Sequence, residues 1–227
     1  MVTERFEELN VVRKRGRPGD LRVALLYPSI YRVAALSLSF QMIYYYVNRL
    51  EGFVCERFVL SRLRGDEPPL RSLERGSPLS AFDVVLISVH YEPDFVNVVR
   101  ALIASGIEPL SEKRSKPLVV AGGPPIMANP EPLLPFLDVA VVGEIEATLP
   151  YLMERLLELG ADKRQLIDEL PPERGFYTLN TEGEVVAAIS RDLPIEFHPI
   201  AEFQPARGWE RTTMIEVMRG CWRRCRL

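Results

Sequence analysis

The sequence contains few cysteines and histidines, and it has no long apolar run. Its 227 residues include three cysteines and two histidines. Three cysteines are too few for a disulfide framework, and their odd number argues against full pairing. No stretch reaches the roughly 18 apolar residues of a membrane span. Residues 1–20 are charged throughout and lack the apolar core of a secretory signal. These absences predict a cytoplasmic protein with no membrane partner.

The charge is nearly balanced. A formal net charge of −3 predicts no strong attraction to nucleic acid or to an anionic membrane. Basic stretches at residues 13–17 and 219–226 leave a nucleic-acid-binding protein as an alternative. Acidic residues elsewhere offset them, so a solvated surface is the expected role of these stretches.

Short apolar runs alternate with helical patterns from residue 21 onward. Five runs predict buried strands, at residues 21–28, 53–60, 82–91, 117–123 and 137–143. Helices are expected between and after them, at residues 35–50, 94–104, 132–136 and 144–159. Asp94 is the expected cap of the second helix. The last helix carries an apolar stripe of Leu149, Leu152, Met153, Leu156 and Leu157.

Strands that are apolar on both faces require a parallel sheet between two layers of helices. The expected fold class is therefore α/β, with a Rossmann-like, doubly wound, mainly parallel five-stranded sheet.

The pattern changes at about residue 166. Two alternating runs around residues 181–183 predict a β-hairpin, followed by a proline-rich linker. Residues 213–218 predict one more strand, which has no partner in the preceding pattern and is assigned to a further domain. The expected organisation is an N-terminal extension (1–20), a Rossmann-like domain (21–165), a hairpin linker (166–206) and the start of a second domain (207–227).

Three residues separate Cys221 from Cys225, and Arg219 and Gly220 precede the pair. Such a pair alone is compatible with helical neighbours, half of a zinc site, cluster ligands or no site. Together with the preceding strand, the pair resembles the cluster motif C-x-x-x-C-x-x-C of the radical S-adenosylmethionine (SAM) superfamily. The resemblance implies that Cys221 and Cys225 are metal ligands of a 4Fe–4S cluster whose open iron binds SAM. The third cysteine would fall just beyond Leu227, so a chain ending there would be truncated inside the motif, would hold no normal cluster and would be inactive.

Three upstream segments support the same resemblance: LYPSIYRVAALSLSFQMIYYYVN, VVAGGPPIMANPEPLLPFLDVAVVGEIEATLP and LISVHYEPDF. They are similar to the cobalamin (B12)-binding-type domain that precedes the cluster domain in many radical SAM enzymes. The resemblance implies a cofactor edge at the carboxyl ends of the strands. Its expected residues are Tyr27, Pro28, Ser29, Ser88, Gly122, Gly123 and Pro124.

Each part of this edge has a simpler alternative. Gly122 and Gly123 would let the backbone approach a large flat ligand, or they form only a tight turn. Glu144, which follows Gly143, is equally well explained as a favourable charge at a helix start. The loop after the first strand lacks the Asp-x-His-x-x-Gly motif, so cobalamin would bind without a histidine from that loop. His90 is the expected packing or hydrogen-bonding residue at this edge.

The expected function is the N-terminal part of a radical SAM iron–sulfur enzyme, whose partner is the remainder of the radical SAM barrel and whose substrate is not specified. The alternative is a stand-alone Rossmann-like module that binds a corrinoid or another small ligand without catalysis. No G-x-G-x-x-G follows the first strand, so a dinucleotide is not the expected ligand. Cys55, inside an apolar run, is expected in the core.

Overall fold

The computed structural model describes residues 7–63, 65–205 and 208–220. A six-stranded sheet lies at its centre, in the order β3-β2-β4-β5-β6-β7. The first five of these strands pair in parallel, and β7 is antiparallel to β6. The strands are β2 (Leu21–Ile30), β3 (Phe53–Leu60), β4 (Val84–Ser88), β5 (Leu118–Gly122), β6 (Val139–Val141) and β7 (Phe176–Tyr177). The prediction of a mainly parallel, Rossmann-like α/β sheet is confirmed.

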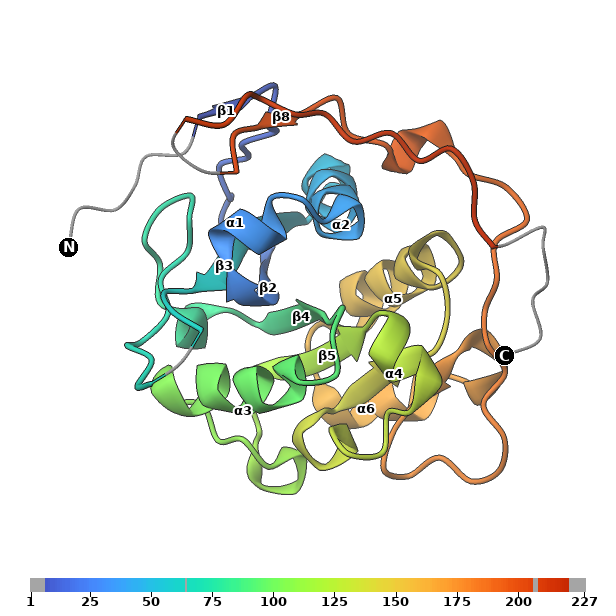
Figure 1. Ribbon diagram of the computed structural model, residues 1–227. Coiled ribbons are helices and arrows are strands. Elements are labelled where there is room, and N and C mark those ends of the chain that lie inside the picture. The colour runs from blue at the N-terminus through green and yellow to red at the C-terminus, as the bar shows by residue number, and fades with distance from the viewer. Residues whose placement is uncertain (1–6, 64, 206–207, 221–227) are drawn as a thin grey trace.

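Helices cover both faces of the sheet (Figure 1). They are α1 (Tyr31–Ala34), α2 (Leu38–Arg49), α3 (Asp94–Ala104), α4 (Pro124–Ala128), α5 (Ile145–Leu159) and α6 (Lys163–Glu169). Short 3-10 helices lie at Leu79–Ala81, Ser111–Lys113, Leu134–Phe136, Pro172–Arg174 and Ile195–Phe197. Along β2, Leu25 packs with α2 and α5 on one face, while Leu26 packs with α3 on the other. Both side chains are fully buried, because a strand between two helix layers has no solvent-facing side.

The helix expected at residues 35–50 is α2, which begins three residues later than predicted, and the short helix α1 precedes the expected range. Ser37 is extended, and its hydroxyl accepts a hydrogen bond from the backbone N–H of Phe40, so a new helix begins at Leu38. Asp94 is the first residue of α3, and the capping position belongs to Pro93. In the apolar stripe of α5, Leu157 is 58% exposed while the other four side chains are buried. The start of α2 and the cap of α3 therefore differ from the prediction by three residues and one residue, and one of the five stripe residues is exposed.

The sheet has six strands and not the expected five, and the expected hairpin is absent from the described residues. Phe176, from the first run of that hairpin, pairs with β6 as part of β7 and is fully buried. Ala188, from the second run, makes a parallel bridge to Gly143. Both segments satisfy backbone groups at the free edge of β6. Local alternation predicted the extended backbone but could not reveal which strand it would pair with.

A second, two-stranded sheet joins β1 (Glu8–Leu9) to β8 (Glu202–Phe203). The chain after β7 packs outside α2, where the rings of Tyr46 and Phe197 stack with centroids 4.1 Å apart (Figure 1). Pairing continues to a bridge between Phe203 and Thr212. The predicted strand at residues 213–218 is not formed. The segment contacts His198 and Ala201 through side-chain hydrogen bonds, and its backbone joins no β-ladder.

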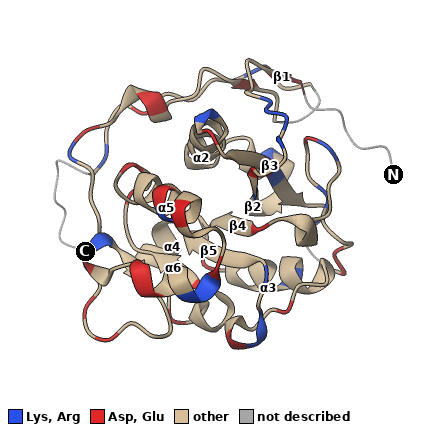
Figure 2. Ribbon diagram, turned by 180° about the vertical axis from the view of Figure 1, so that it is seen from behind, with Lys and Arg blue, Asp and Glu red and all other residues tan. Residues whose placement is uncertain are grey.

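Charged residues lie mainly on the outer surfaces of the helices and loops, whereas the sheet carries few (Figure 2). Among the residues that the structure describes, no helix combines the length and the apolar character that a membrane crossing requires.

Candidate functional site

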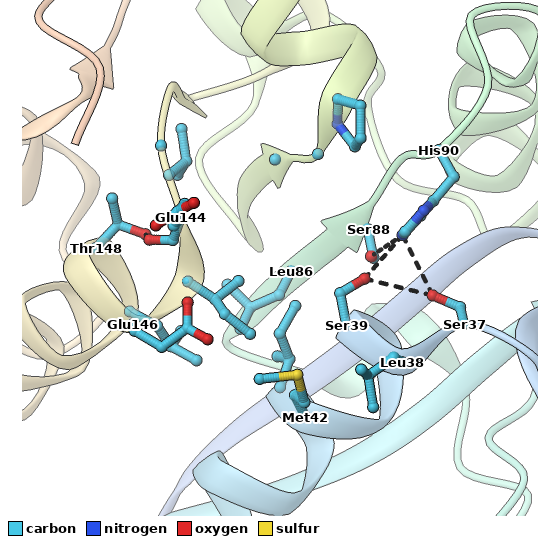
Figure 3. Close-up of a pocket in the computed structure, with 18 of the residues that line it drawn as sticks. Ser37, Leu38, Ser39, Met42, Leu86, Ser88, His90, Glu144, Glu146 and Thr148 are labelled. Atoms are coloured by element: carbon cyan, nitrogen blue, oxygen red, sulfur yellow. Dashed lines mark hydrogen bonds between the residues drawn. The ribbon is translucent and has the colours of Figure 1, made fainter. Parts of the chain in front are cut away.

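A pocket of about 480 Å³ lies at the carboxyl ends of β4 and β5 (Figure 3). It is next to the position where the strand order reverses, between β2 and β4. Ligands of open α/β sheets bind at this kind of edge. The volume falls within the roughly 300–1,000 Å³ of pockets that hold small molecules. The location and the size both make this pocket the candidate site.

The pocket walls are mainly apolar. They come from α2, the sheet and α5, and include Met42, Ile43, Leu86, Val120, Leu149 and Leu152. Such walls exclude water from a bound molecule and strengthen the polar interactions made inside the pocket. The polar groups gather in two clusters, one at the start of α2 and one at the start of α5.

The first is the serine–histidine cluster, formed by Ser37, Ser39, Ser88 and His90 (Figure 3). Nε2 of His90 lies 3.2, 2.9 and 3.0 Å from the hydroxyl oxygens of Ser37, Ser39 and Ser88. Ser37 caps α2, and Ser88 ends β4, so regular backbone fixes two of the three hydroxyls. The cluster offers hydroxyl and imidazole groups that can both donate to and accept from a ligand.

The imidazole of His90 stacks on Tyr27, with ring centroids 5.3 Å apart and an interplanar angle of 26°. Removal from water disfavours the charged form of the ring and lowers the pKa of His90 below its usual value. The neutral form of the ring is therefore favoured. One nitrogen of a neutral imidazole is an acceptor, which can position a polar group or hold a proton.

The second is the glutamate–arginine cluster, formed by Glu144, Glu146, Glu216 and Arg219. The Arg219 guanidinium donates to both carboxylate oxygens of Glu146, at 2.9 and 2.5 Å. It also donates to both oxygens of Glu216, at 2.5 and 2.8 Å, and Nη1 lies 3.3 Å from a carboxylate oxygen of Glu144. Hydrogen bonds to Glu146 and Glu216 raise the pKa of Arg219 above its usual value, so it stays charged.

The helix α5 explains the position of two of these carboxylates. Glu144 is its N-cap residue, and Glu146 lies in its first turn. Negative charge is favoured there by the helix dipole. Glu216 and Arg219 come instead from the segment that follows Thr212, and both line the pocket. The pocket is thus closed by a part of the chain that lies outside the Rossmann-like domain expected from the sequence.

The structure brings some of the predicted cofactor-edge residues together. Ser88, Gly122, Gly123 and Pro124 line the pocket. The other three, Tyr27, Pro28 and Ser29, are buried and are not among the lining residues. Tyr27 lies beneath the site, where it supports the ring of His90. The binding roles of all seven residues stay predictions.

The predicted metal ligands Cys221 and Cys225 lie outside the described residues. Within the described part of the chain, no group of three or more histidine, cysteine, aspartate or glutamate side chains could hold a metal ion. Cys55 is buried, as expected for a core residue, and burial raises the pKa of its thiol. It therefore lies in β3 as an unreactive thiol.

Four residues of the two clusters were not predicted: Ser37, Ser39, Glu146 and Glu216. Ser37 carried a recognisable signal, since a serine before a helical pattern predicts an N-cap. Glu146 follows Glu144 at a spacing that places both in the first turn of a helix. Nothing local to Glu216 indicated that its segment would reach a pocket on another part of the chain.

Comparison with known proteins gives two findings. The family model described as "Radical SAM proteins, N-terminal" matches residues 39–178, which run from the start of α2 to the end of β7. The uncharacterized protein MJ0966 of Methanocaldococcus jannaschii is 27% identical over 206 residues. That alignment covers 90% of this chain and 40% of the relative, so the chain spans well under half of the length of the relative it matches.

Proposed function

This chain belongs to the family of radical SAM proteins, N-terminal, and from that premise we propose that it is the N-terminal part of a radical SAM iron–sulfur enzyme. The expected cluster ligands are Cys221 and Cys225, and the expected cosubstrate is SAM. The remainder of the barrel would be supplied by the rest of the enzyme. The substrate is not specified.

One observation carries the proposal. Arg219, two residues before Cys221, is hydrogen-bonded to Glu146 on the wall of the pocket. The described chain therefore reaches the edge of the candidate ligand site at Arg219, two positions before the motif. A radical reaction needs this arrangement, because the bound molecule has to lie close to the group that generates the radical.

The donor chemistry fits an iron–sulfur cluster. Thiolates are the usual ligands of such clusters, and three of them leave one iron open. Gly220 has a φ of 77°, a conformation that glycine adopts without strain and that turns the backbone immediately before Cys221. When bound, such a cluster supplies the electron that cleaves SAM to methionine and a 5′-deoxyadenosyl radical.

The pocket residues would act on the bound molecule itself. The apolar walls keep water away from it, and the serine–histidine cluster orients a polar group by hydrogen bonds. The neutral imidazole of His90 can accept a proton at Nε2 or donate one to a neighbouring hydroxyl. These contributions do not depend on which molecule the enzyme uses as substrate.

Cobalamin fits this pocket poorly. A corrin ring with its nucleotide tail is larger than the drug-sized molecules for which a cavity of about 480 Å³ is typical. Nε2 of His90 already faces three hydroxyls and is not free to ligate cobalt. Gly123 has a structural reason of its own, because a Cβ there would lie 1.9 Å from the carbonyl oxygen of Val89. We therefore assign the pocket to a smaller molecule and derive no step through cobalamin.

A second candidate function is a ligand-binding module without catalysis. The observation that favours it is that described residues of this chain line the pocket. A binding module would keep the pocket and would not depend on Cys221 or Cys225.

Formation of 5′-deoxyadenosine separates the two functions. The full gene product, reconstituted anaerobically with iron and sulfide and then reduced, should convert SAM to 5′-deoxyadenosine and methionine. Cys221→Ala and Cys225→Ala should abolish the conversion, and Cys55→Ala, in the core, should retain it. Absence of 5′-deoxyadenosine from the reconstituted wild-type protein would contradict the enzyme and favour the binding module.

A further inference from the structure

We infer that Arg219 is a positioning residue: its pairing with Glu146 fixes the start of the cysteine motif against the pocket wall. The inference rests on the proposed function for the role of the cysteines. The pairing of Arg219 with Glu146 is observed in the structure and does not depend on that function. It joins two features that are 73 positions apart in the sequence, the acidic start of α5 and the Arg-Gly pair before the motif.

The contact between Arg219 and Glu146 is bidentate. Two guanidinium nitrogens reach the two oxygens of one carboxylate, at 2.9 and 2.5 Å. Planar, two-point pairing of this kind fixes orientation as well as distance, which a lysine ammonium cannot do. The guanidinium of Arg219 is thereby fixed relative to α5.

The burial of Glu146 requires that its carboxylate have a charged partner. The side chain of Glu146 is only 1% exposed, whereas that of Arg219 is 27% exposed. A buried carboxylate without a partner is strongly unfavourable, so loss of the guanidinium would expel Glu146 or disturb the start of α5. Arg219 is accordingly held in place by the need of Glu146 for a counter-charge.

The rest of the segment depends on few other contacts. The backbone N–H of Glu216 donates to Nε2 of His198 at 3.1 Å, and the hydroxyl of Thr213 donates to the carbonyl oxygen of Ala201 at 3.3 Å. The segment has no helix or strand over residues 213–219. Its position is thus determined by side-chain contacts, of which the glutamate–arginine cluster is the last before the motif.

The cluster also forms part of the pocket lining, through Glu146, Glu216 and Arg219. A molecule in the pocket therefore touches the same side chains that hold the start of the motif. Any preference of that molecule for the paired arrangement stabilises the arrangement by the same free energy, because linkage is reciprocal. The same side chains therefore line the pocket and hold Arg219.

Hydrogen exchange tests the pairing in this chain. Glu146→Gln keeps the size of the side chain and removes its charge. The amide of Glu216, whose N–H donates to Nε2 of His198, should then exchange at least about threefold faster than in the wild type, because the segment that holds it is released. The matched control is Glu154→Gln on the same helix, at a side chain that is 60% exposed. Exchange in β4 and β5 reports whether the variant is folded. Unchanged exchange at the Glu216 amide in a folded Glu146→Gln variant would overturn the inference.

Distance measurement tests positioning in the full gene product. A nitroxide amino acid at residue 157, on the exposed face of α5, and a reduced 4Fe–4S cluster give a distance distribution by pulsed electron paramagnetic resonance. The wild type and Glu154→Gln should give one narrow distribution, and Glu146→Gln and Arg219→Gln should broaden it while iron content is retained. A broad wild-type distribution, or a narrow one in both variants, would overturn the positioning role. Absence of any cluster signal in the wild type would contradict the proposed function instead.

Discussion

The carbonyl oxygen of Val89 occupies the space that a side chain on Gly123 would need. An ideal Cβ at Gly123 would lie 1.9 Å from this oxygen, and the residue has a φ of 123°. The turns after β4 and β5 therefore touch each other at the rim of the pocket. This close approach accounts for the glycine without any ligand, and it makes the rim a rigid part of the site.

The first prediction concerns this rim. Gly123→Ala should reduce the free energy of unfolding by more than about 2 kcal/mol, because a methyl group would force the two turns apart and would strain a left-handed backbone. Gly122→Ala is the control, since its Cβ would meet only ordinary contacts, the nearest at 3.5 Å. Urea unfolding of both variants measures the difference. Equal urea midpoints for the two variants would contradict the prediction, because they would show that the two turns can move apart at little cost in stability.

The second prediction concerns a buried ion-paired group beneath the N-terminal segment. The side chain of Arg57 is 2% exposed and donates hydrogen bonds to Glu8 and Glu74, at 2.8 and 2.7 Å. Arg57→Met should destabilise the fold by about 3–5 kcal/mol, since it leaves two carboxylates largely buried without their counter-charge. Thermal or urea unfolding measures the loss. A change of less than about 1 kcal/mol would contradict this role of Arg57.

The third prediction concerns Glu8, the partner of Arg57, and the pH dependence of the free energy of unfolding. Burial by itself raises the pKa of Glu8, but the charge and hydrogen bond of Arg57, with the hydroxyl of Tyr31, outweigh it and lower the pKa overall. A lowered pKa contributes stability above the unfolded-state pKa, about 4.3 for a glutamate, and that stability is lost as the pH falls through the folded-state pKa. Glu8→Gln should flatten the acid limb of the stability–pH curve, and Glu7→Gln, at an exposed neighbour, should not. Parallel curves for wild type and Glu8→Gln would refute the assignment.

The fourth prediction concerns His90. Its ring should titrate in the folded protein with a midpoint below the ordinary value of about 6.5, because desolvation disfavours the charged form. Below that ordinary value the unfolded chain binds the proton more readily, so this residue reduces stability as the pH falls from about 6.5 toward the folded-state pKa. Nuclear magnetic resonance titration of the imidazole C–H signals measures it, with His198→Asn to assign the two rings. A midpoint at or above about 6.5 would contradict the desolvated environment of the ring.

The fifth prediction follows from the size of the pocket. Hydroxocobalamin added to this chain should leave its visible spectrum unchanged, because the cavity of about 480 Å³ is too small for a corrin and offers no free axial ligand at Nε2 of His90. Equilibrium dialysis gives an independent measure of binding. A spectral shift that saturates at one corrinoid per chain would show instead that the edge opens to admit it.

The central sheet could be predicted from the sequence because its signals are local. Continuous apolar runs are buried on both faces wherever they pair, so the first five strands and the parallel class followed directly. The partner of Phe176 could not be predicted, because β7 has only two residues and its pairing is decided by the free edge of β6. The same limit applies to residues 213–218, where the sequence indicated a strand but His198 and Ala201 contact the segment through side-chain hydrogen bonds and not through a β-ladder.

The site was predictable in part. Ser88 and the Gly122–Pro124 turn follow strands whose carboxyl ends share one edge, and the structure places them in one pocket. The contact between Glu146 and Arg219 was not predictable, because the two residues are 73 positions apart in the sequence. Each also has a simpler explanation by itself: an acidic residue is favourable at the start of a helix, and a basic residue is common on a solvated surface. Tertiary structure supplies the information that the two halves meet.

The most direct test of the account is the iron and sulfide content of the full gene product after anaerobic reconstitution. The account predicts about four iron and four sulfide per chain in the wild type and in Cys55→Ala, and a loss of most of both in Cys221→Ala and in Cys225→Ala. If the wild-type protein takes up no iron, or if the two variants hold as much as the wild type, the cysteines after Arg219 are not cluster ligands and the assignment as an enzyme is wrong.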